Sequence, residues 1–181
     1  MCEPRGARKR CHFMLVKNLI QKRQAKGFRF AVVASQYNAR FVDSMTAAAL
    51  DHLRRAGAAV VDLFRVPGAF EIPVVVGELV RRKPKAYDAV ICLGLIVRGE
   101  TTHADHIGQA VTESLASAQM QYGIPLIHEV LVVANEAQAT ARCLDPEKNR
   151  GVEAAQTAVS MAQLMASMKS CFRVSRRSRP D

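Results

Sequence analysis

Residues 93–107 carry the side chains of this chain that are best suited to chemistry, in the order Leu-Gly-Leu-Ile-Val-Arg-Gly-Glu-Thr-Thr-His-Ala-Asp-His-Ile. An apolar run from Ala86 ends in this stretch, and a helix-compatible segment then extends to about Tyr122. The pattern predicts a buried strand that delivers the loop 99–102 to the start of a helix. The first N–H groups of a helix lack intrahelical partners and lie at the positive end of its dipole. The loop could therefore hold a phosphate or a carboxylate.

His103 follows that loop directly. A histidine at an anion-binding helix start suits proton transfer, because imidazole exchanges protons near neutral pH. Two alternatives stay open on the residues alone: an ordinary capping turn, and a histidine that only decorates the helix surface. His103 and His106 also lie three positions apart with Asp105 between them, a spacing that can bind metal. No third ligand clusters with them, so we predict no metal site.

Two further loops follow apolar segments and could share this site. Residues 28–35 and 59–66 are predicted to be buried parallel strands, and in open α/β sheets ligands bind just outside the carboxyl ends of the strands. The first strand leads to Tyr37, which could stack on a planar ligand or close the core, and to Asn38, an expected helix N-cap. The second strand leads to the loop 67–73.

The loop 67–73 has the sequence Pro-Gly-Ala-Phe-Glu-Ile-Pro. Its two prolines fix φ and remove hydrogen-bond donors, so we expect a stiff binding wall, with Pro73 in the first turn of a helix. Glu71 could accept hydrogen bonds from a polyol or an amine. Helix capping is the simpler alternative, and the residues alone favour it. The motifs Gly-x-x-x-x-Gly-Lys and Gly-x-Gly-x-x-Gly are missing, which disfavours nucleotide hydrolysis and a dinucleotide cofactor.

Four apolar strands alternate with helical patterns along the chain. Strands are predicted at 28–35, 59–66, 87–97 and 124–133, and helices at about 40–55, 73–82, from the loop 99–102 to 122, 136–143 and 151–169. Such alternation indicates parallel strands joined by right-handed crossovers, with helices on both faces. We predict a three-layer, flavodoxin-like α/β sandwich around a central four-stranded parallel sheet.

The net charge of +10 lies in the two ends of the chain. Residues 1–27 hold eight Lys/Arg and one Glu, residues 169–181 hold five Lys/Arg and one Asp, and the rest is nearly neutral. We expect a mostly irregular N-terminal arm (1–27) and a solvated C-terminal tail (169–181). Nucleic-acid binding usually needs a basic stripe on ordered structure, and no apolar run approaches a membrane span, so neither partner is expected. Five cysteines without a CxxC motif suggest reduced thiols in a cytoplasmic protein.

Three separated motifs together resemble the lumazine synthase family. They are Pro-Gly-Ala-Phe-Glu-Ile-Pro at 67–73, the stretch from Leu93-Gly94 through Arg98-Gly-Glu-Thr-Thr-His103, and Asn-Arg-Gly-Val-Glu-Ala-Ala at 149–155. The likeness covers about 28–168, which would be the catalytic domain. It implies a cofactor-free condensation of 5-amino-6-(D-ribitylamino)uracil with 3,4-dihydroxy-2-butanone 4-phosphate. The product would be 6,7-dimethyl-8-ribityllumazine, with phosphate and water released, in the penultimate step of riboflavin biosynthesis.

The resemblance also implies roles for individual residues. His103 matches the proposed proton donor, and Arg142 matches the arginine that joins the phosphate loop. The substrate-binding residues would be Tyr37, Asn38, Ala69, Phe70, Glu71, Leu95, Ile96, Val97, Glu100, Thr101, His128 and Arg142. Tyr37 would stack on the pyrimidine, residues 69–71 would bind the ribityl chain and ring, and the backbone of 95–97 would read the pyrimidine edge.

The family builds each site between adjacent subunits, so the resemblance implies a homopentamer, and some members form icosahedral shells of sixty subunits. His128 departs from the family pattern, because many members carry a phenylalanine there that belongs to the neighbouring subunit. Two other functions compete with this hypothesis, beside a weak third, nucleic-acid binding through the two basic ends. One is the related riboflavin synthase, which the phosphate loop with His103 argues against because that reaction has no phosphorylated substrate. The other is a non-catalytic binding or shell-forming protein.

Overall fold

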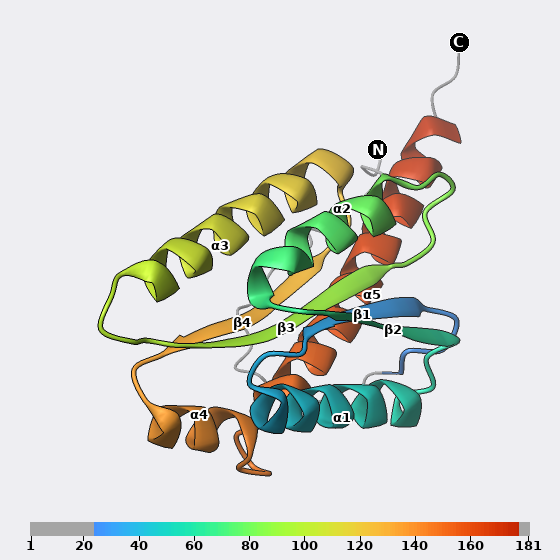
Figure 1. The fold of residues 1–181 in the computed structure, drawn as a ribbon. Coiled ribbons are helices and arrows are strands. Elements are labelled where there is room, and N and C mark those ends of the chain that lie inside the picture. The colour runs from blue at the N-terminus through green and yellow to red at the C-terminus, as the bar shows by residue number, and fades with distance from the viewer. Residues whose placement is uncertain (1–23, 178–181) are drawn as a thin grey trace, which may run out of the picture.

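This computed structural model describes residues 24–177, with side chains described through Cys171. Strands and helices alternate along the chain. They are β1 (Arg29–Ser35), α1 (Ala39–Arg55), β2 (Val60–Val66), the 3-10 helix η1 (Ala69–Glu71), α2 (Ile72–Arg81), β3 (Ala89–Val97), α3 (His103–Tyr122), β4 (Leu126–Val133), α4 (Glu136–Cys143) and α5 (Arg150–Arg177). The elements form one layered unit (Figure 1).

The four strands form one parallel sheet in the order β2-β1-β3-β4. The two central strands are apolar without alternation: β1 reads RFAVVAS and β3 reads AVICLGLIV, and nearly all of their residues are buried. A strand that is apolar on both sides needs cover on both faces. The sheet therefore confirms the predicted four parallel strands.

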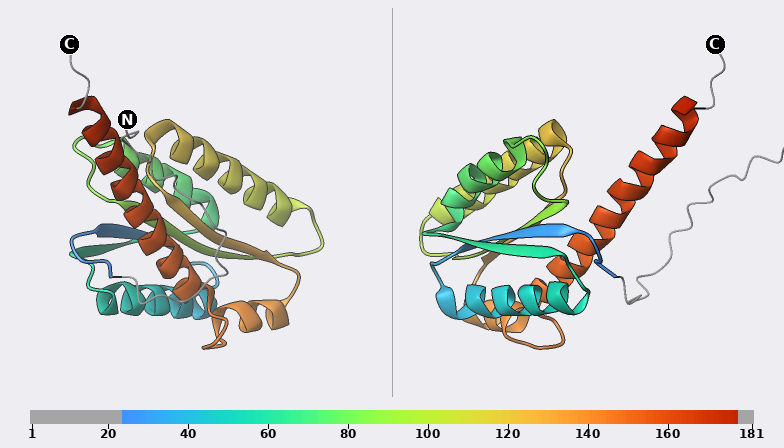
Figure 2. Two further views of the ribbon diagram at one scale, coloured as in Figure 1. Left: turned by 180° about the vertical axis from the view of Figure 1, so that it is seen from behind. Right: turned by 90° about the vertical axis from the view of Figure 1, so that its right-hand side faces the viewer.

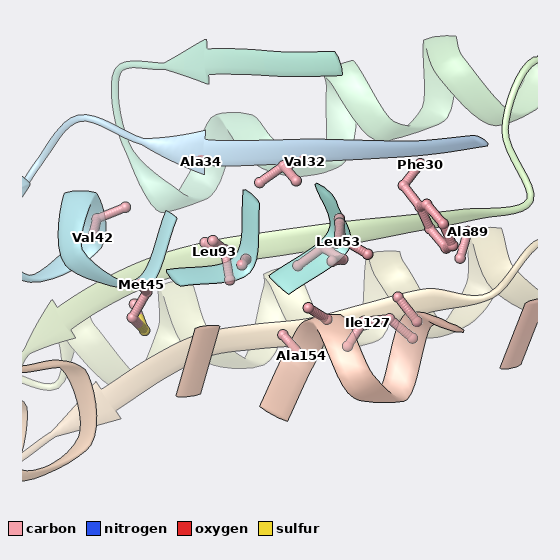
Figure 3. Packing of buried hydrophobic residues seen from close by; sticks show 14 of the residues in the cluster. Phe30, Val32, Ala34, Val42, Met45, Leu53, Ala89, Leu93, Ile127 and Ala154 are labelled. Atoms are coloured by element: carbon pink, nitrogen blue, oxygen red, sulfur yellow. The ribbon is translucent and has the colours of Figure 1, made fainter. Parts of the chain in front are cut away.

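Helices cover the two faces of the sheet (Figure 1). On one face, α1, α4 and α5 pack against residues such as Phe30, Val32 and Leu93 (Figure 3). On the other face, α2 and α3 pack against Val33, Cys92 and neighbouring residues. Each face thus has its own apolar core, and the arrangement confirms the predicted three-layer α/β fold.

Local signals mark where the helices begin and end, as the sequence predicts. Gly123 follows α3 with a φ of 58°, a left-handed conformation that glycine adopts without a steric penalty. Asn135 caps α4, since its side chain accepts a hydrogen bond from the N–H of Gln138 at 3.0 Å. Pro73 lies in the first turn of α2, where its missing N–H costs nothing.

The chain ends differ from the expectation at one point. We expected the last helix to stop near Lys169, but α5 continues to Arg177, so much of the basic tail is helical. Figure 2 shows this end of α5 extending past the layers of the fold. Of the N-terminal arm only 24–27 is described, where Lys26 forms an isolated antiparallel bridge with Ala58. The prediction for 1–23 lies outside the described residues. Within 24–177, no helix has the length and apolar character needed to span a membrane.

Candidate functional site

Three segments, called here the three loops, lie at the carboxyl ends of the strands, where the sequence places the site: 36–38, 67–71, and the end of β3 together with the loop that follows it (95–102). The loop after β1 touches the loop after β2, because the N–H of Tyr37 donates to the carbonyl of Pro67 at 3.0 Å. The same loop also touches β3, because Asn38 Nδ2 donates to the carbonyl of Leu95 at 2.8 Å. These backbone and side-chain bonds hold 36–38, 67–71 and 95–97 as one surface.

Asn38 performs a different task from the one predicted. It does occupy the position before α1, but its side chain makes no capping hydrogen bond. Its backbone is left-handed, with a φ of 57°, a conformation that asparagine tolerates better than most residues. That backbone turns the amide away from the helix and toward Leu95. The expected cap is therefore wrong, and Asn38 ties the first loop to β3.

Glu71 is fixed by the backbone of its own loop. Its Oε2 accepts a hydrogen bond from the N–H of Gly68 at 2.8 Å, which is the capping role that the residues alone favour. A Cβ on Gly68 would lie 2.8 Å from Glu71 Oε2 and 3.0 Å from Tyr37 Cδ2. A larger residue there would displace the carboxylate of Glu71 and press on the ring of Tyr37, so Gly68 lets both side chains approach the loop backbone.

Two aromatic side chains are presented to solvent at this surface. Tyr37 is 71 % exposed and Phe70 is 59 % exposed, which is unusual for side chains of this size. Tyr37 therefore does not close the core, and the stacking alternative is the one that its position permits. Ala69 is buried, and the 3-10 turn that it begins carries the exposed Phe70.

The end of β3 forms the floor of this surface. Leu95 is buried and Ile96 is half-buried, whereas Val97 is 39 % exposed. The carbonyl of Leu95 already accepts the amide of Asn38, so recognition through that oxygen would have to use its second lone pair. The strand thus emerges from the core at the site, as a parallel strand does at its carboxyl end.

The start of α3 directly follows the loop 99–102 that was predicted to bind an anion. Thr102 precedes the helix without capping it through its side chain. The N–H of His103 donates to Thr101 Oγ1 at 3.5 Å and the N–H of Asp105 donates to the carbonyl of Thr102 at 3.1 Å, so an anion at this helix start would have to displace the long bond of His103 or use the N–H of Ala104. Glu100, Thr101 and His103 are all exposed there. The imidazole of His103 therefore lies at the solvent side of the loop, within a single chain.

Neighbouring side chains stiffen this loop. Arg98 pairs with Asp105, with Nη2 to Oδ1 at 2.8 Å, and Thr102 Oγ1 lies 3.2 Å from His106 Nε2. Asp105 and His106 are therefore engaged with the loop itself. Among residues 24–177, no group of three or more His, Cys, Asp or Glu side chains is arranged to hold a metal ion.

Arg142 lies away from the other predicted residues in a single chain. It is exposed on α4, which packs on the α1 and α5 face of the sheet, whereas α3 with His103 packs on the opposite face. Figure 1 shows α4 and the start of α3 on the two sides of the sheet. One copy of the chain therefore does not place Arg142 beside His103.

His128 also lies apart from the surface formed by the loops. In the sheet register it is opposite Cys92, three residues before the pairing of Leu95 with Leu131, or about 10 Å along the strand. Its Nε2 lies 3.0 Å from Thr112 Oγ1 on α3, and burial lowers its pKa. His128 is thus held by its own chain, on the face that α3 covers.

Glu129 is an ionisable residue with a strongly shifted pKa that the sequence did not single out. It lies half-buried in β4 on the side of α4 and α5, and burial raises its pKa to about 7. The positive charges of Arg150 and Arg142 oppose this rise, and the charge of Glu153 adds to it. The sequence does place a glutamate within an apolar strand, which could have drawn attention to it. Only the packing shows which charged side chains surround that glutamate.

Comparison with known proteins identifies the family of this chain. The sequence model of the family described as 6,7-dimethyl-8-ribityllumazine synthase matches residues 27–166. The chain belongs to this family. A relative of that name from Aquifex aeolicus is 39% identical over 150 residues, covering 82% of this chain and 96% of the relative. Relatives of the same name from Pyrococcus furiosus (37% over 141 residues, 78% and 87% covered) and Clostridium kluyveri (36% over 150 residues, 82% and 96% covered) are similar.

Membership in the lumazine synthase family makes the chain a transferase enzyme of riboflavin biosynthesis. The family match spans all three loops of the candidate site and ends at residue 166. Most of the N-terminal arm and the end of α5 therefore lie outside the part that this chain shares with the lumazine synthase family.

Proposed function

We propose that this enzyme condenses 5-amino-6-(D-ribitylamino)uracil with 3,4-dihydroxy-2-butanone 4-phosphate to 6,7-dimethyl-8-ribityllumazine. The amine of the first substrate attacks the ketone of the second, and water leaves as the imine forms. Phosphate is then eliminated, and the ring closes with loss of a second water. These steps need proton transfers and two substrates held in contact, which is chemistry that side chains alone can support.

The observation that carries the proposal is the convergence of the three loops around the bond from Asn38 to Leu95. Exposed Tyr37 and Phe70 offer apolar area for a planar pyrimidine next to the end of β3. Glu71, already fixed on Gly68, presents its carboxylate to ribityl hydroxyl groups. The surface formed by the three loops therefore suits a substrate with a flat ring and several hydroxyl groups.

The phosphate would bind at the start of α3. First-turn N–H groups and the dipole of a helix of twenty residues favour a phosphate at Glu100 and Thr101. Because the phosphate is the leaving group, the same contacts stabilise it as it departs. His103, exposed beside this loop, would donate and accept the protons that imine formation and phosphate loss require.

The active enzyme would be a homopentamer in which neighbouring chains share each site. Arg142 and His128 lie apart from His103 within one chain, so they would complete the site of an adjacent subunit. The Arg142 guanidinium would then reach a phosphate held on the neighbour's α3, a geometry suited to bidentate hydrogen bonding. Larger shells built from such pentamers are compatible with the same contact.

A turnover assay tests the reaction directly. Purified protein is mixed with both substrates, and lumazine formation is measured above the uncatalysed background for the wild type and for His103→Ala. Side-chain acid–base catalysis contributes on the order of 10²-fold or more, and water can partly replace an exposed imidazole. We therefore expect kcat to fall by about tenfold to a hundredfold.

His52→Gln is the matched control, because His52 lies on α1, remote from the three loops. It should keep the turnover of the wild type. Equal turnover by His103→Ala would remove His103 from the mechanism and leave substrate positioning as the main contribution. A folded, assembled wild-type protein with no turnover would refute the reaction and favour the binding or shell-forming alternative.

A further inference from the structure

A cavity of about 290 Å³ lies at the opposite end of the sheet from the three loops. Its walls are the end of α5, the segment 85–88 before β3, and the turn 123–125 between α3 and β4. These segments surround the ends where the parallel strands begin, whereas the candidate active site lies where they finish. The volume is at the lower end of the range for small-ligand pockets.

The cavity is lined by both apolar and positively charged residues. Ile124, Pro125 and Met165 supply apolar surface, and Lys85 and Lys169 supply two positive charges. Within the described residues, neither lysine has an acidic group within 4 Å. Burial and then the nearby charge of Lys169 lower the pKa of Lys85, so two like charges face the same space.

The ammonium group of Lys85 is fixed in position by the end of α3. Its Nζ donates to the carbonyls of Tyr122 and Gly123 at 2.9 and 3.0 Å, at the end of α3. An ammonium group has three donors, so one N–H of Lys85 remains beyond these two bonds. Among the other polar side chains of the wall, Tyr87 donates to Asp62 and Ser170 donates to the carbonyl of Ser167. Asp88 is the one acidic side chain of the wall, and its Oδ2 accepts the N–H of Arg29 at 2.9 Å.

We propose that this cavity binds the phosphate group of a small organic phosphate between Lys85 and Lys169, with the apolar part of the ligand on Met165 and Ile124. A phosphate monoester carries close to two negative charges at neutral pH, which matches the two ammonium groups. The volume limits the ligand to a short substituent. Lys169 lies beyond the family match, so the site depends on the extended α5 of this chain.

Calorimetric titration of the full-length, assembled protein with butyl phosphate tests the site. The Lys169→Gln variant removes one of the two positive charges from an exposed helical position, so the fold should persist. Lys85→Gln removes the other charge. We expect each change to weaken binding in the cavity at least about tenfold, since charge-assisted hydrogen bonds contribute this much. Inorganic phosphate, which lacks the apolar part, should bind more weakly than butyl phosphate.

Two matched variants separate this cavity from the catalytic phosphate loop. Lys83→Gln removes a lysine of the same segment that does not line the cavity and should leave the affinity unchanged. Arg142→Ala impairs the proposed catalytic phosphate site and should leave binding in the cavity intact. Lumazine formation by Lys169→Gln should equal that of the wild type, so the two proposals can fail independently.

Binding that survives in Lys169→Gln and Lys85→Gln but disappears in Arg142→Ala would overturn the proposal, as would the absence of heat from the wild type. Sedimentation with phosphatidylcholine vesicles containing phosphatidic acid distinguishes the source of the phosphate. Vesicle binding that Lys169→Gln abolishes would assign the same chemistry to a lipid headgroup. Binding of butyl phosphate without vesicle binding would assign it to a soluble ligand.

Discussion

Glu129 places a carboxylate where the sheet would otherwise present only apolar side chains to α5. Its strand neighbours on the same side, Ile127 and Leu131, pack into the core formed with α1 and α5. Burial is the largest influence on the Glu129 carboxyl and raises its pKa to about 7. The folded protein therefore favours the protonated form, and ionisation of this group opposes folding.

The pH dependence of stability should report this residue. The carboxyl of Glu129 ionises near 4.5 in the unfolded chain and near 7 in the folded protein. Its favourable contribution is complete below 4.5 and is lost as the pH rises through 7. Glu129→Gln, which cannot ionise, should therefore be more stable than the wild type at pH 8 by about 1–2 kcal/mol, a value reduced for partial exposure.

Urea denaturation at pH 5 and at pH 8 measures this difference. The advantage of Glu129→Gln should shrink as the pH falls toward 5, because the wild-type carboxyl then keeps its proton. Glu136→Gln, on the exposed first turn of α4, is the control and should show no gain at high pH. A constant difference at both pH values would mean that burial of the Glu129 charge does not limit stability.

At the scale of single residues, the sequence predicted the kind of role of a side chain better than it predicted the hydrogen-bond partner. Glu71 was expected to cap its loop, and the bond to Gly68 confirms it. Asn38 was expected to cap α1 but reaches Leu95, because its left-handed backbone redirects the amide across 57 residues of sequence. Such a contact depends on which strands are adjacent, and no local pattern encodes it. The substrate roles of these residues stay predictions.

At the scale of elements, α1 and α5 cross at a point that only glycine permits. A Cβ on Gly151 would overlap the backbone carbonyl of Met45, deep inside van der Waals distance. The N–H of Gly151 is also bonded to Asn149 Oδ1 at 2.8 Å, so the start of α5 cannot shift freely. The motif around 149–155 thus has a structural purpose in addition to any contact with substrate.

A pair of glycine substitutions tests this crossing. Gly151→Ala forces α5 away from α1 and should lower the free energy of unfolding by about 3 kcal/mol or more, as overpacking against rigid backbone does. Gly77→Ala lies in α2, where an added Cβ meets no atom within 4 Å, and should stabilise the protein by roughly 0.5–1 kcal/mol. Thermal unfolding compares the two. Equal stability of both variants would show that α1 and α5 can separate at no cost.

Most element positions could be predicted because apolar runs and helix signals are local. The strands and the first four main helices begin and end within about two residues of their expected bounds, whereas η1 and the last two turns of α5 were missed. The 3-10 turn depends on the contact between Glu71 and Gly68. The end of α5 carries basic and polar residues that read as a solvated tail, yet it continues a helix already formed.

At the scale of the whole molecule, the sheet separates the proposed catalytic groups. His103 lies on the face covered by α3, and Arg142 lies on the face covered by α4. A site that needs both would have to use His103 from one chain and Arg142 from another. The sequence could suggest both residues, but it could not show that one chain keeps them apart.

Mixing two impaired variants should therefore restore activity. Subunits with His103→Ala and subunits with Arg142→Ala are co-assembled in equal amounts. If adjacent subunits share each site, about a quarter of the interfaces in a random mixture regain both wild-type groups. Turnover should then exceed the mean of the two variants measured separately. Turnover equal to that mean, in assemblies shown by native mass spectrometry to be mixed, would place each complete site within one chain.

The hydrogen bond from Gln163 Nε2 to the carbonyl of Gln24, at 2.8 Å, has a practical consequence for engineering. It anchors the first described residue on α5, and the helix then runs on to Arg177, about 21 Å farther along its axis. Gln24 and the last described turns of α5 therefore lie at the end of the sheet where the strands begin, away from the three loops. A reporter split into halves and joined to Gln24 and Arg177, in place of the residues beyond them, would reassemble at that end and leave the three loops open to substrate.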